Sequence, residues 1–162
     1  MKLLVTGGTF DKEYDEISGR LFFKETHVAE MLHLGRSGVA IEVETLMMID
    51  SLEMSEHDRS LIVDRCKSTS ENQIIVTHGT DTMELTARAL GEAKIAGKTI
   101  VLTGAMVPYK FGSSDGLFNL GSAIAFAQTL PNGVYVAMNG RWFSWESVRK
   151  NKSTGEFYEE KK

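Results

Sequence analysis

The sequence of 162 residues lacks several features that define whole classes of protein. Its single cysteine, Cys66, excludes an intrachain disulfide framework, and no nearby cysteine or histidine completes a zinc site with it. No segment approaches the roughly 18 apolar residues of a membrane-spanning helix, and the apolar run at residues 2–5 is too short for a signal-peptide core. We therefore expect a cytoplasmic protein with no membrane partner.

Positive charge is also scarce. The 18 Lys and Arg residues face 22 Asp and Glu residues, giving a formal net charge of −4. This balance argues against nucleic acid as the main partner and leaves small polar molecules open. The length and the 42% hydrophobic content favour a single domain over residues 1–162 with a sizeable core. The polar, charged end predicts a frayed tail over residues 155–162.

Short apolar segments alternate with segments of helical periodicity. Buried strands are predicted at residues 2–6, 39–47, 73–77, 99–103 and 133–138. Helices are predicted near residues 25–35, 55–66, 82–94 and 114–127, with Ser114 or Asp115 capping the last. The alternation predicts an α/β fold, a doubly wound and mostly parallel sheet with helices on both faces.

Two further segments have their own signals. Residues 10–24 have mixed polarity and no helical period, which predicts a loop. Asn139-Gly140 is a hairpin-turn dipeptide, so the chain is expected to return as a strand over residues 141–144.

Hydroxyl groups and glycines follow several of the predicted strands. Carboxyl ends of parallel strands share one edge of a sheet, where ligands bind. That edge receives Thr6-Gly7-Gly8-Thr9, Ser51, His78-Gly79-Thr80-Asp81 and Gly104-Ala105-Met106. Each threonine alone is best explained as a cap of a turn or helix, but together with Asp81 and the glycines the pair forms a candidate site. A phosphate cradle at Gly7-Gly8 fits poorly, because G-x-G-x-x-G is missing and no helix follows directly.

A threonine hydroxyl is a weak nucleophile until a base takes its proton. Lys150 is the informative candidate, because it follows the last strands and Asp81 could orient it. The alternative is that Lys150 belongs to a solvated basic face with its neighbours. Tyr14 could cover Thr9 as part of a lid, or it could be anchored in the core.

The remaining titratable groups carry weaker signals. His78 could act as a base at the end of a strand, but a buried structural imidazole is favoured. His27, His33 and His57 lack metal-ligand spacing and are interpreted as surface or packing residues. Nothing near Cys66 would lower its pKa, which indicates an inert core thiol.

Four motifs resemble the bacterial-type L-asparaginase family. They are T-G-G-T-F at 6–10, H-G-T-D-T-M-E at 78–84, L-T-G-A-M at 102–106 and S-D-G-L-F-N-L at 114–120. The resemblance covers nearly the whole chain and corresponds to the family's larger N-terminal domain. It implies hydrolysis of the side-chain amide of L-asparagine through a threonine acyl-enzyme, without a metal or an organic cofactor.

The resemblance also implies catalytic roles. Thr9 matches the family's nucleophile, and Tyr14 is a loosely aligned match to the loop tyrosine that supports it. Thr80, Asp81 and Lys150 match a second catalytic group that shares a hydrogen-bond chain.

The implied substrate contacts come from the same loops. Ser51 matches the serine that holds the α-carboxylate, Asp81 would also face the α-amino group, and Ala105 matches an alanine beside the reacting amide. Backbone N–H groups placed by Gly8 and Gly79 could stabilise the oxyanion.

The chain also departs from the family pattern. Members usually carry a second, smaller domain that completes the site of a neighbouring subunit, and this chain ends before it. Leu52 stands where many members have a polar, substrate-contacting residue, and the loop after Thr9 is short. We expect a homo-oligomer, because an open site would otherwise remain wet. A non-catalytic amino-acid or amide-binding domain is the alternative, and glutamine or a larger amide remains open as the substrate.

Overall fold

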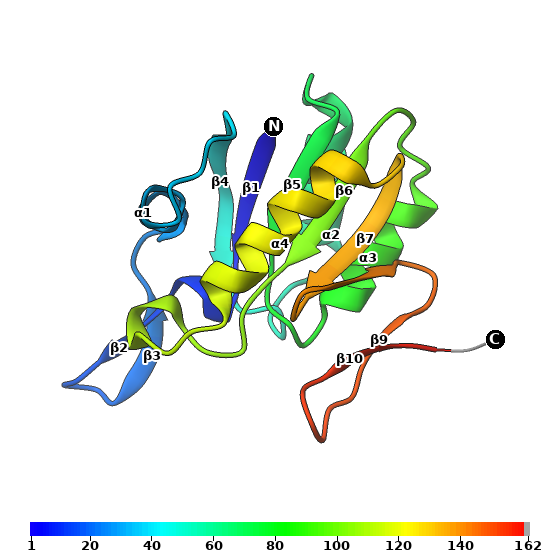
Figure 1. Cartoon of the computed structure of the whole chain (residues 1–162). Coiled ribbons are helices and arrows are strands. Elements are labelled where there is room, and N and C mark those ends of the chain that lie inside the picture. Colours follow the sequence, from blue (N-terminus) through cyan, green and yellow to red (C-terminus); the bar gives the residue numbers. More distant parts are fainter. Residues whose placement is uncertain (161–162) are drawn as a thin grey trace.

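The computed structural model describes residues 1–160 and shows a central sheet with helices on both of its faces (Figure 1). Six strands form the sheet in the order β4-β1-β5-β6-β7-β8. Their bounds are Lys2–Gly7 (β1), Glu42–Ile49 (β4), Gln73–Thr77 (β5), Thr99–Thr103 (β6), Gly133–Met138 (β7) and Arg141–Ser144 (β8). Neighbouring strands pair in parallel from β4 to β7, and β8 pairs antiparallel with β7. The predicted α/β fold class is confirmed.

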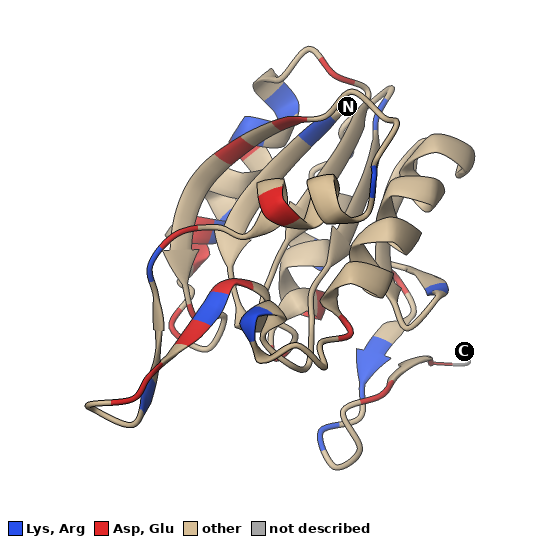
Figure 2. Cartoon of the chain, turned by 60° about the vertical axis from the view of Figure 1, so that its left-hand side comes forward, with Lys and Arg blue, Asp and Glu red and all other residues tan. Residues whose placement is uncertain are grey.

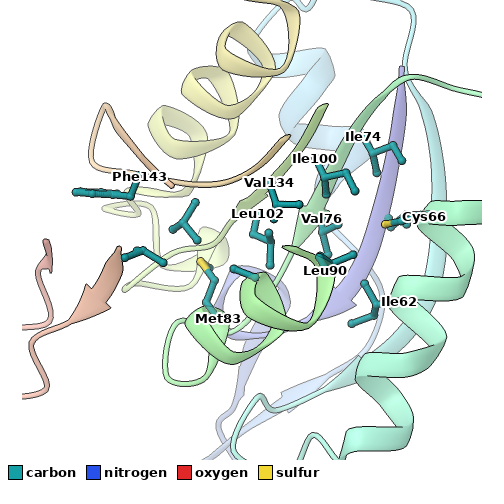
Figure 3. Packing of buried hydrophobic residues seen from close by; sticks show 14 of the residues in the cluster. Ile62, Cys66, Ile74, Val76, Met83, Leu90, Ile100, Leu102, Val134 and Phe143 are labelled. Atoms are coloured by element: carbon teal, nitrogen blue, oxygen red, sulfur yellow. The ribbon is translucent and has the colours of Figure 1, made fainter. Parts of the chain in front are cut away.

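Four helices cover the sheet. They are α1 (Val28–Leu34), α2 (Glu56–Ser68), α3 (Met83–Glu92) and α4 (Gly116–Thr129). Helices α1 and α4 pack on one face with Leu3, Val5 and Ile75, while α2 and α3 pack on the other with Leu4, Ile74 and Val76. Figure 3 shows the cluster on the α2 and α3 face, with Ile74 and Val76 of β5 labelled. Successive side chains of a strand point to opposite faces, so the continuous apolar runs of the sequence supply both halves of the core.

The strand order contains one reversal that positions a site. From β1 the chain crosses to β4 on one side, and from β4 it crosses back to β5 on the other side of β1. The chain that follows β1 therefore leads to α1 on one face of the sheet, and the chain that follows β5 leads to α3 on the other. Such a switch point is where open α/β sheets bind ligands, and these two loops carry Thr9 and Thr80.

The prediction of a loop over residues 10–24 is wrong in part. The turn η1 (Thr9–Asp11) leads into an antiparallel hairpin of β2 (Lys12–Asp15) and β3 (Arg20–Phe23), which projects from the body of the domain (Figure 1). The sequence Lys-Glu-Tyr-Asp gives no strand pattern, because β2 is mostly half-buried and contributes no side chain to the hydrophobic core. Helix α1 also begins later than predicted, and β4 spans residues 42–49 instead of 39–47.

The predicted frayed tail is also ordered in part. Phe157–Glu159 forms β10, which pairs antiparallel with β9 (Val148–Lys150). Phe157 is buried in the core, and one apolar residue in a charged segment is too short a pattern to predict a strand. Residues 161 and 162 lie outside the described residues. The hairpin turn at Asn139-Gly140 is confirmed, with positive φ at both residues.

Candidate functional site

Glycines let the loops at the carboxyl edge approach one another closely. A β-carbon on Gly8 would lie 2.3 Å from the backbone nitrogen of Gly79, and one on Gly79 would lie 2.5 Å from Oγ of Ser51. A β-carbon on Gly104 would lie 2.3 Å from the carbonyl oxygen of His78. The loops after β1, β4, β5 and β6 therefore form one interlocked group.

Thr9 opens the turn that follows Gly8. The φ of Gly8 is 84°, a left-handed conformation that favours glycine, and the Asp11 N–H donates to the Gly8 carbonyl at 3.2 Å. The buried Asp11 carboxylate accepts from the His27 N–H at 2.8 Å and from the Thr26 hydroxyl at 3.1 Å. The turn bearing Thr9 is thus anchored to the start of α1, while Thr9 itself stays partly exposed.

Lys150 joins Thr80 and Asp81 across the edge. Its Nζ donates to Oγ1 of Thr80 at 2.8 Å and to Oδ1 of Asp81 at 2.6 Å. The Lys150 side chain is only 8% exposed, whereas Asp81 is 50% exposed. Lys150 is therefore not part of a solvated basic face. Because Oγ1 of Thr80 accepts from the ammonium group, its hydroxyl hydrogen is available to another acceptor, and it donates to Sδ of Met106 at 3.6 Å.

Helix α3 holds the strand that carries Lys150. The Lys150 N–H donates to Oε2 of Glu84 at 3.2 Å. A β-carbon on Gly91 would lie 2.2 Å from the indole of Trp145, so α3 and the segment before β9 are in direct contact. The same helix follows Thr80 and Asp81 in the sequence. Helix α3 therefore helps to position Thr80, Asp81 and Lys150, the hydrogen-bonded group called the Lys150 chain below.

His78 is a structural imidazole, as the sequence favours. It is fully buried, and burial lowers its pKa to about 4. Nδ1 lies 2.7 Å from the Gly79 carbonyl oxygen, which can only accept, so Nε2 accepts from the Thr86 hydroxyl at 2.7 Å. The ring thereby fixes the loop before Thr80. Cys66 is buried too, and burial raises the pKa of its thiol to about 12, so it stays protonated.

Asp115 and Asn119 fix the loop that carries Ala105, a role that sequence reasoning missed. The Asp115 carboxylate accepts from the N–H groups of Met106 and Val107, each at 3.0 Å, and makes no cap bond to α4. Asn119 donates to the Gly104 carbonyl at 2.8 Å. The motif S-D-G-L-F-N-L contains both residues, and their i,i+4 spacing at a helix start was the available signal.

Tyr14 is not brought to Thr9 in this structure. It lies on β2, is 57% exposed, and its hydroxyl would be 3.9 Å from a β-carbon on Gly19 near the tip of the hairpin. The alternative that Tyr14 is anchored in the core is therefore wrong.

A cavity of about 560 Å³ lies over the Lys150 chain. Asp81, Thr82 and Lys150 form part of its wall, together with Leu52, Met106 and residues 152–155. Among residues 1–160, no three His, Cys, Asp or Glu side chains gather so as to hold a metal ion. Nor is any helix in that part of the chain long and apolar enough to cross a membrane.

Sequence comparison of the chain with known proteins finds one matching family. The family model described as asparaginase, N-terminal, matches residues 1–156. The L-asparaginase of Thermococcus kodakarensis is 30% identical over 96% of this chain and 49% of its own length. A glutaminase-asparaginase of Acinetobacter glutaminasificans is 43% identical over 54% of this chain and 27% of its own length.

A solved structure agrees with these sequence matches. The structure of a probable cytoplasmic L-asparaginase from Campylobacter jejuni superposes with a TM-score of 0.80 at 29% identity, over 92% of this chain and 48% of the other. Nearly all of this chain is matched in these two relatives, and it spans about half of their length.

Proposed function

The chain belongs to the asparaginase family, and from this membership we propose that it is an amidohydrolase that converts L-asparagine to L-aspartate and ammonia. The observation that carries the proposal is the chain from Lys150 to Thr80 and Asp81, built beside the Thr9 turn at the switch point of the sheet. A hydroxyl nucleophile beside a proton relay that includes a lysine is a typical arrangement for acyl transfer.

In the proposed mechanism, the Thr9 oxygen bonds to the amide carbon and forms a tetrahedral intermediate. The carbon–nitrogen bond then breaks, and the Thr9 proton leaves with the nitrogen as ammonia. Water attacks the resulting ester, giving aspartate and restoring the Thr9 hydroxyl. Thr80, Asp81 and Lys150 relay these protons: Lys150 as an uncharged amine takes up one proton through the Thr80 hydroxyl and returns it to the leaving nitrogen, and the Asp81 carboxylate balances the charge of the ammonium group formed in between.

The proposed substrate contacts use the interlocked loops. Ser51 holds the α-carboxylate, Asp81 faces the α-amino group, and Ala105 lies beside the amide. The backbone N–H groups of Gly79 and Thr80 have no acceptor among residues 1–160, which supports a role for this loop in stabilising the oxyanion. Gly8 and Gly79 contribute by allowing the close approach of the two loops.

The proposal gives Tyr14 a role only if the hairpin moves. In the described conformation its ring is exposed on the hairpin, so it would support Thr9 after the hairpin folds toward the carboxyl edge. The hairpin is tied at its base by the ion pair between Lys12 and Asp50 and by Glu13, whose carboxylate lies 3.3 Å from Nε2 of His27.

We also propose that the protein is a cytoplasmic homo-oligomer. The 14 residues of α4 include no charged side chain, and the ribbon of α4 is uniformly tan in Figure 2. Phe118 on this helix is 64% exposed. An uncharged helix with an exposed aromatic residue suits an interface between copies.

Ammonia release from L-asparagine tests the function, with L-glutamine alongside and the protein's melting temperature measured in parallel. The proposal predicts release from L-asparagine. Stabilisation by L-asparagine without any release would contradict catalysis and would favour the non-catalytic amino-acid-binding alternative.

A further inference from the structure

One methionine of the chain differs from the others in its exposure to solvent. Met106 is 44% exposed, whereas every other methionine, all of them within residues 1–160, is half-buried or buried. Cys66, the single cysteine, is buried as well. The thioether of Met106 is therefore the sulfur that a small dissolved oxidant reaches most easily.

Two cavities give access to the Met106 side chain. It lines the cavity of about 560 Å³ over the Lys150 chain and a second cavity of about 570 Å³, and Thr154 and Gly155 also line both. A β-carbon on Gly155 would lie 2.8 Å from Cε of Met106. The glycine in the turn between β9 and β10 therefore leaves room beside the thioether.

A fixed loop holds this sulfur against the Lys150 chain. The Asp115 carboxylate accepts from the N–H groups of Met106 and Val107, each at 3.0 Å, and Asn119 donates to Asp115 at 2.9 Å. Sδ of Met106 accepts from the Thr80 hydroxyl at 3.6 Å. A chemical change at the sulfur therefore acts directly on the Thr80 hydroxyl.

The Thr80 hydroxyl has one hydrogen and two neighbours that can accept it. In the proposed mechanism this hydrogen passes to the uncharged amine of Lys150, whose Nζ lies 2.8 Å from Oγ1 of Thr80. The Met106 thioether is a weak acceptor and competes little for the hydrogen. A sulfoxide oxygen is a stronger acceptor, and rotation within the unbranched methionine side chain brings it to the hydroxyl. Oxidation of Met106 would therefore hold the hydrogen away from Lys150.

We propose that Met106 is a site of reversible oxidation by peroxides that stops turnover. A lone pair of the sulfur forms a bond to one oxygen of a hydroperoxide, and the oxygen–oxygen bond breaks. The proton of the transferred oxygen goes to the leaving oxygen, which departs as water or an alcohol, so the sulfur is oxidised and the peroxide is reduced. A thiol-dependent reductase reverses the change. The inference rests on the proposed function and adds a regulation of the same site.

The test treats the protein with hydrogen peroxide and measures ammonia release at saturating L-asparagine. We expect kcat to fall by about tenfold, because an added hydrogen bond of ordinary net strength must break in each proton transfer. Peptide mass spectrometry should find the first added oxygen atom on Met106. A methionine sulfoxide reductase supplied with a dithiol should restore kcat. The melting temperature should change little, because the oxygen is added to an exposed side chain.

Two variants serve as matched controls, and each is compared with its own untreated rate. Met106→Leu has no sulfur at this position, so peroxide should leave its rate unchanged. Met47→Leu, at a half-buried position on β4, keeps Met106 and should lose the same fraction of activity as the unmodified protein. Equal inactivation of Met106→Leu, full activity of protein oxidised at Met106, or a loss that the reductase does not restore would overturn the inference.

A failure of the proposed function would give a different result. If the untreated protein releases no ammonia, the proposed function fails, and the shift in melting temperature caused by L-asparagine decides the inference instead. A shift that oxidation of Met106 reduces and the reductase restores supports redox control of the same site. A shift that oxidation leaves unchanged, or the absence of any shift, overturns it.

Discussion

At the scale of single residues, the site divides into side chains that the sequence identifies and side chains that only the fold reveals. Thr9, Thr80 and Asp81 could be selected from the sequence, because each stands in a glycine-rich segment after an apolar strand. Glu84 and Asn119 could not, because their roles depend on which backbone groups lie opposite them. Spacing can place Asp115 and Asn119 on one side of a helix, but it does not tell which backbone groups these side chains bind.

The Lys150 ammonium group is expected to be essential for turnover and minor for stability. Lys150→Met should lower kcat by about 10²–10⁴, the range for loss of a proton-transfer group, because Thr80 loses its donor. The melting temperature should change little, since a methionine fills most of the same space and Asp81 is half exposed. Ammonia release and thermal denaturation measure the two effects.

Lys152→Met is the matched control, because Lys152 lines the same cavity and, within residues 1–160, makes no hydrogen bond or ion pair with Thr80 or Asp81. It should retain most of the activity. Equal losses in the two variants would show that the cavity needs positive charge in general and would contradict a specific role for Lys150.

At the scale of secondary-structure elements, the contact between α3 and the segment before β9 links stability to the site. The apolar strands and the helices were predictable because burial gives them a clear period. The pairs β2–β3 and β9–β10 were less so, because each of these strands has only three or four residues, too few for a clear period. Yet β9 carries Lys150, so part of the site rests on an element that has almost no sequence signal.

Two helical glycines should respond in opposite ways to alanine. Gly91→Ala places a β-carbon against Trp145 and should destabilise the protein by about 1–3 kcal/mol, the usual cost of overpacking. It should also lower kcat by displacing β9 and Lys150. Gly121→Ala in α4 meets nothing within 4 Å and should stabilise the protein by about 0.5–1 kcal/mol. Urea unfolding and ammonia release are the measurements, and a neutral Gly91→Ala variant would contradict this coupling.

At the scale of the whole molecule, the strand order determines where chemistry is possible. Hydrophobic periodicity predicted parallel strands, but it could not specify that β4 and β5 lie on opposite sides of β1. That order follows from long-range packing of α1 and α2 on opposite faces, which no local pattern encodes. The reversal sends the segments that follow β1 and β5 to opposite faces of the sheet, and the candidate site lies where these segments begin.

The uncharged face of α4 predicts self-association. Phe118→Glu should shift the molar mass measured by light scattering toward that of the monomer, because a charge would be buried in the interface. Leu61→Glu on α2, which is 46% exposed, should leave the molar mass unchanged. A monomer before any substitution would contradict the proposed oligomer.

The most direct test of the central claim is the rate of ammonia release from L-asparagine by Thr9→Ser and Thr9→Ala at matched concentrations. If the Thr9 hydroxyl is the nucleophile, Thr9→Ser retains measurable activity, whereas Thr9→Ala loses activity by at least about 10³. Folding of both variants is checked by thermal denaturation. Undiminished release by a folded Thr9→Ala variant would contradict the account and would move the nucleophile to another residue.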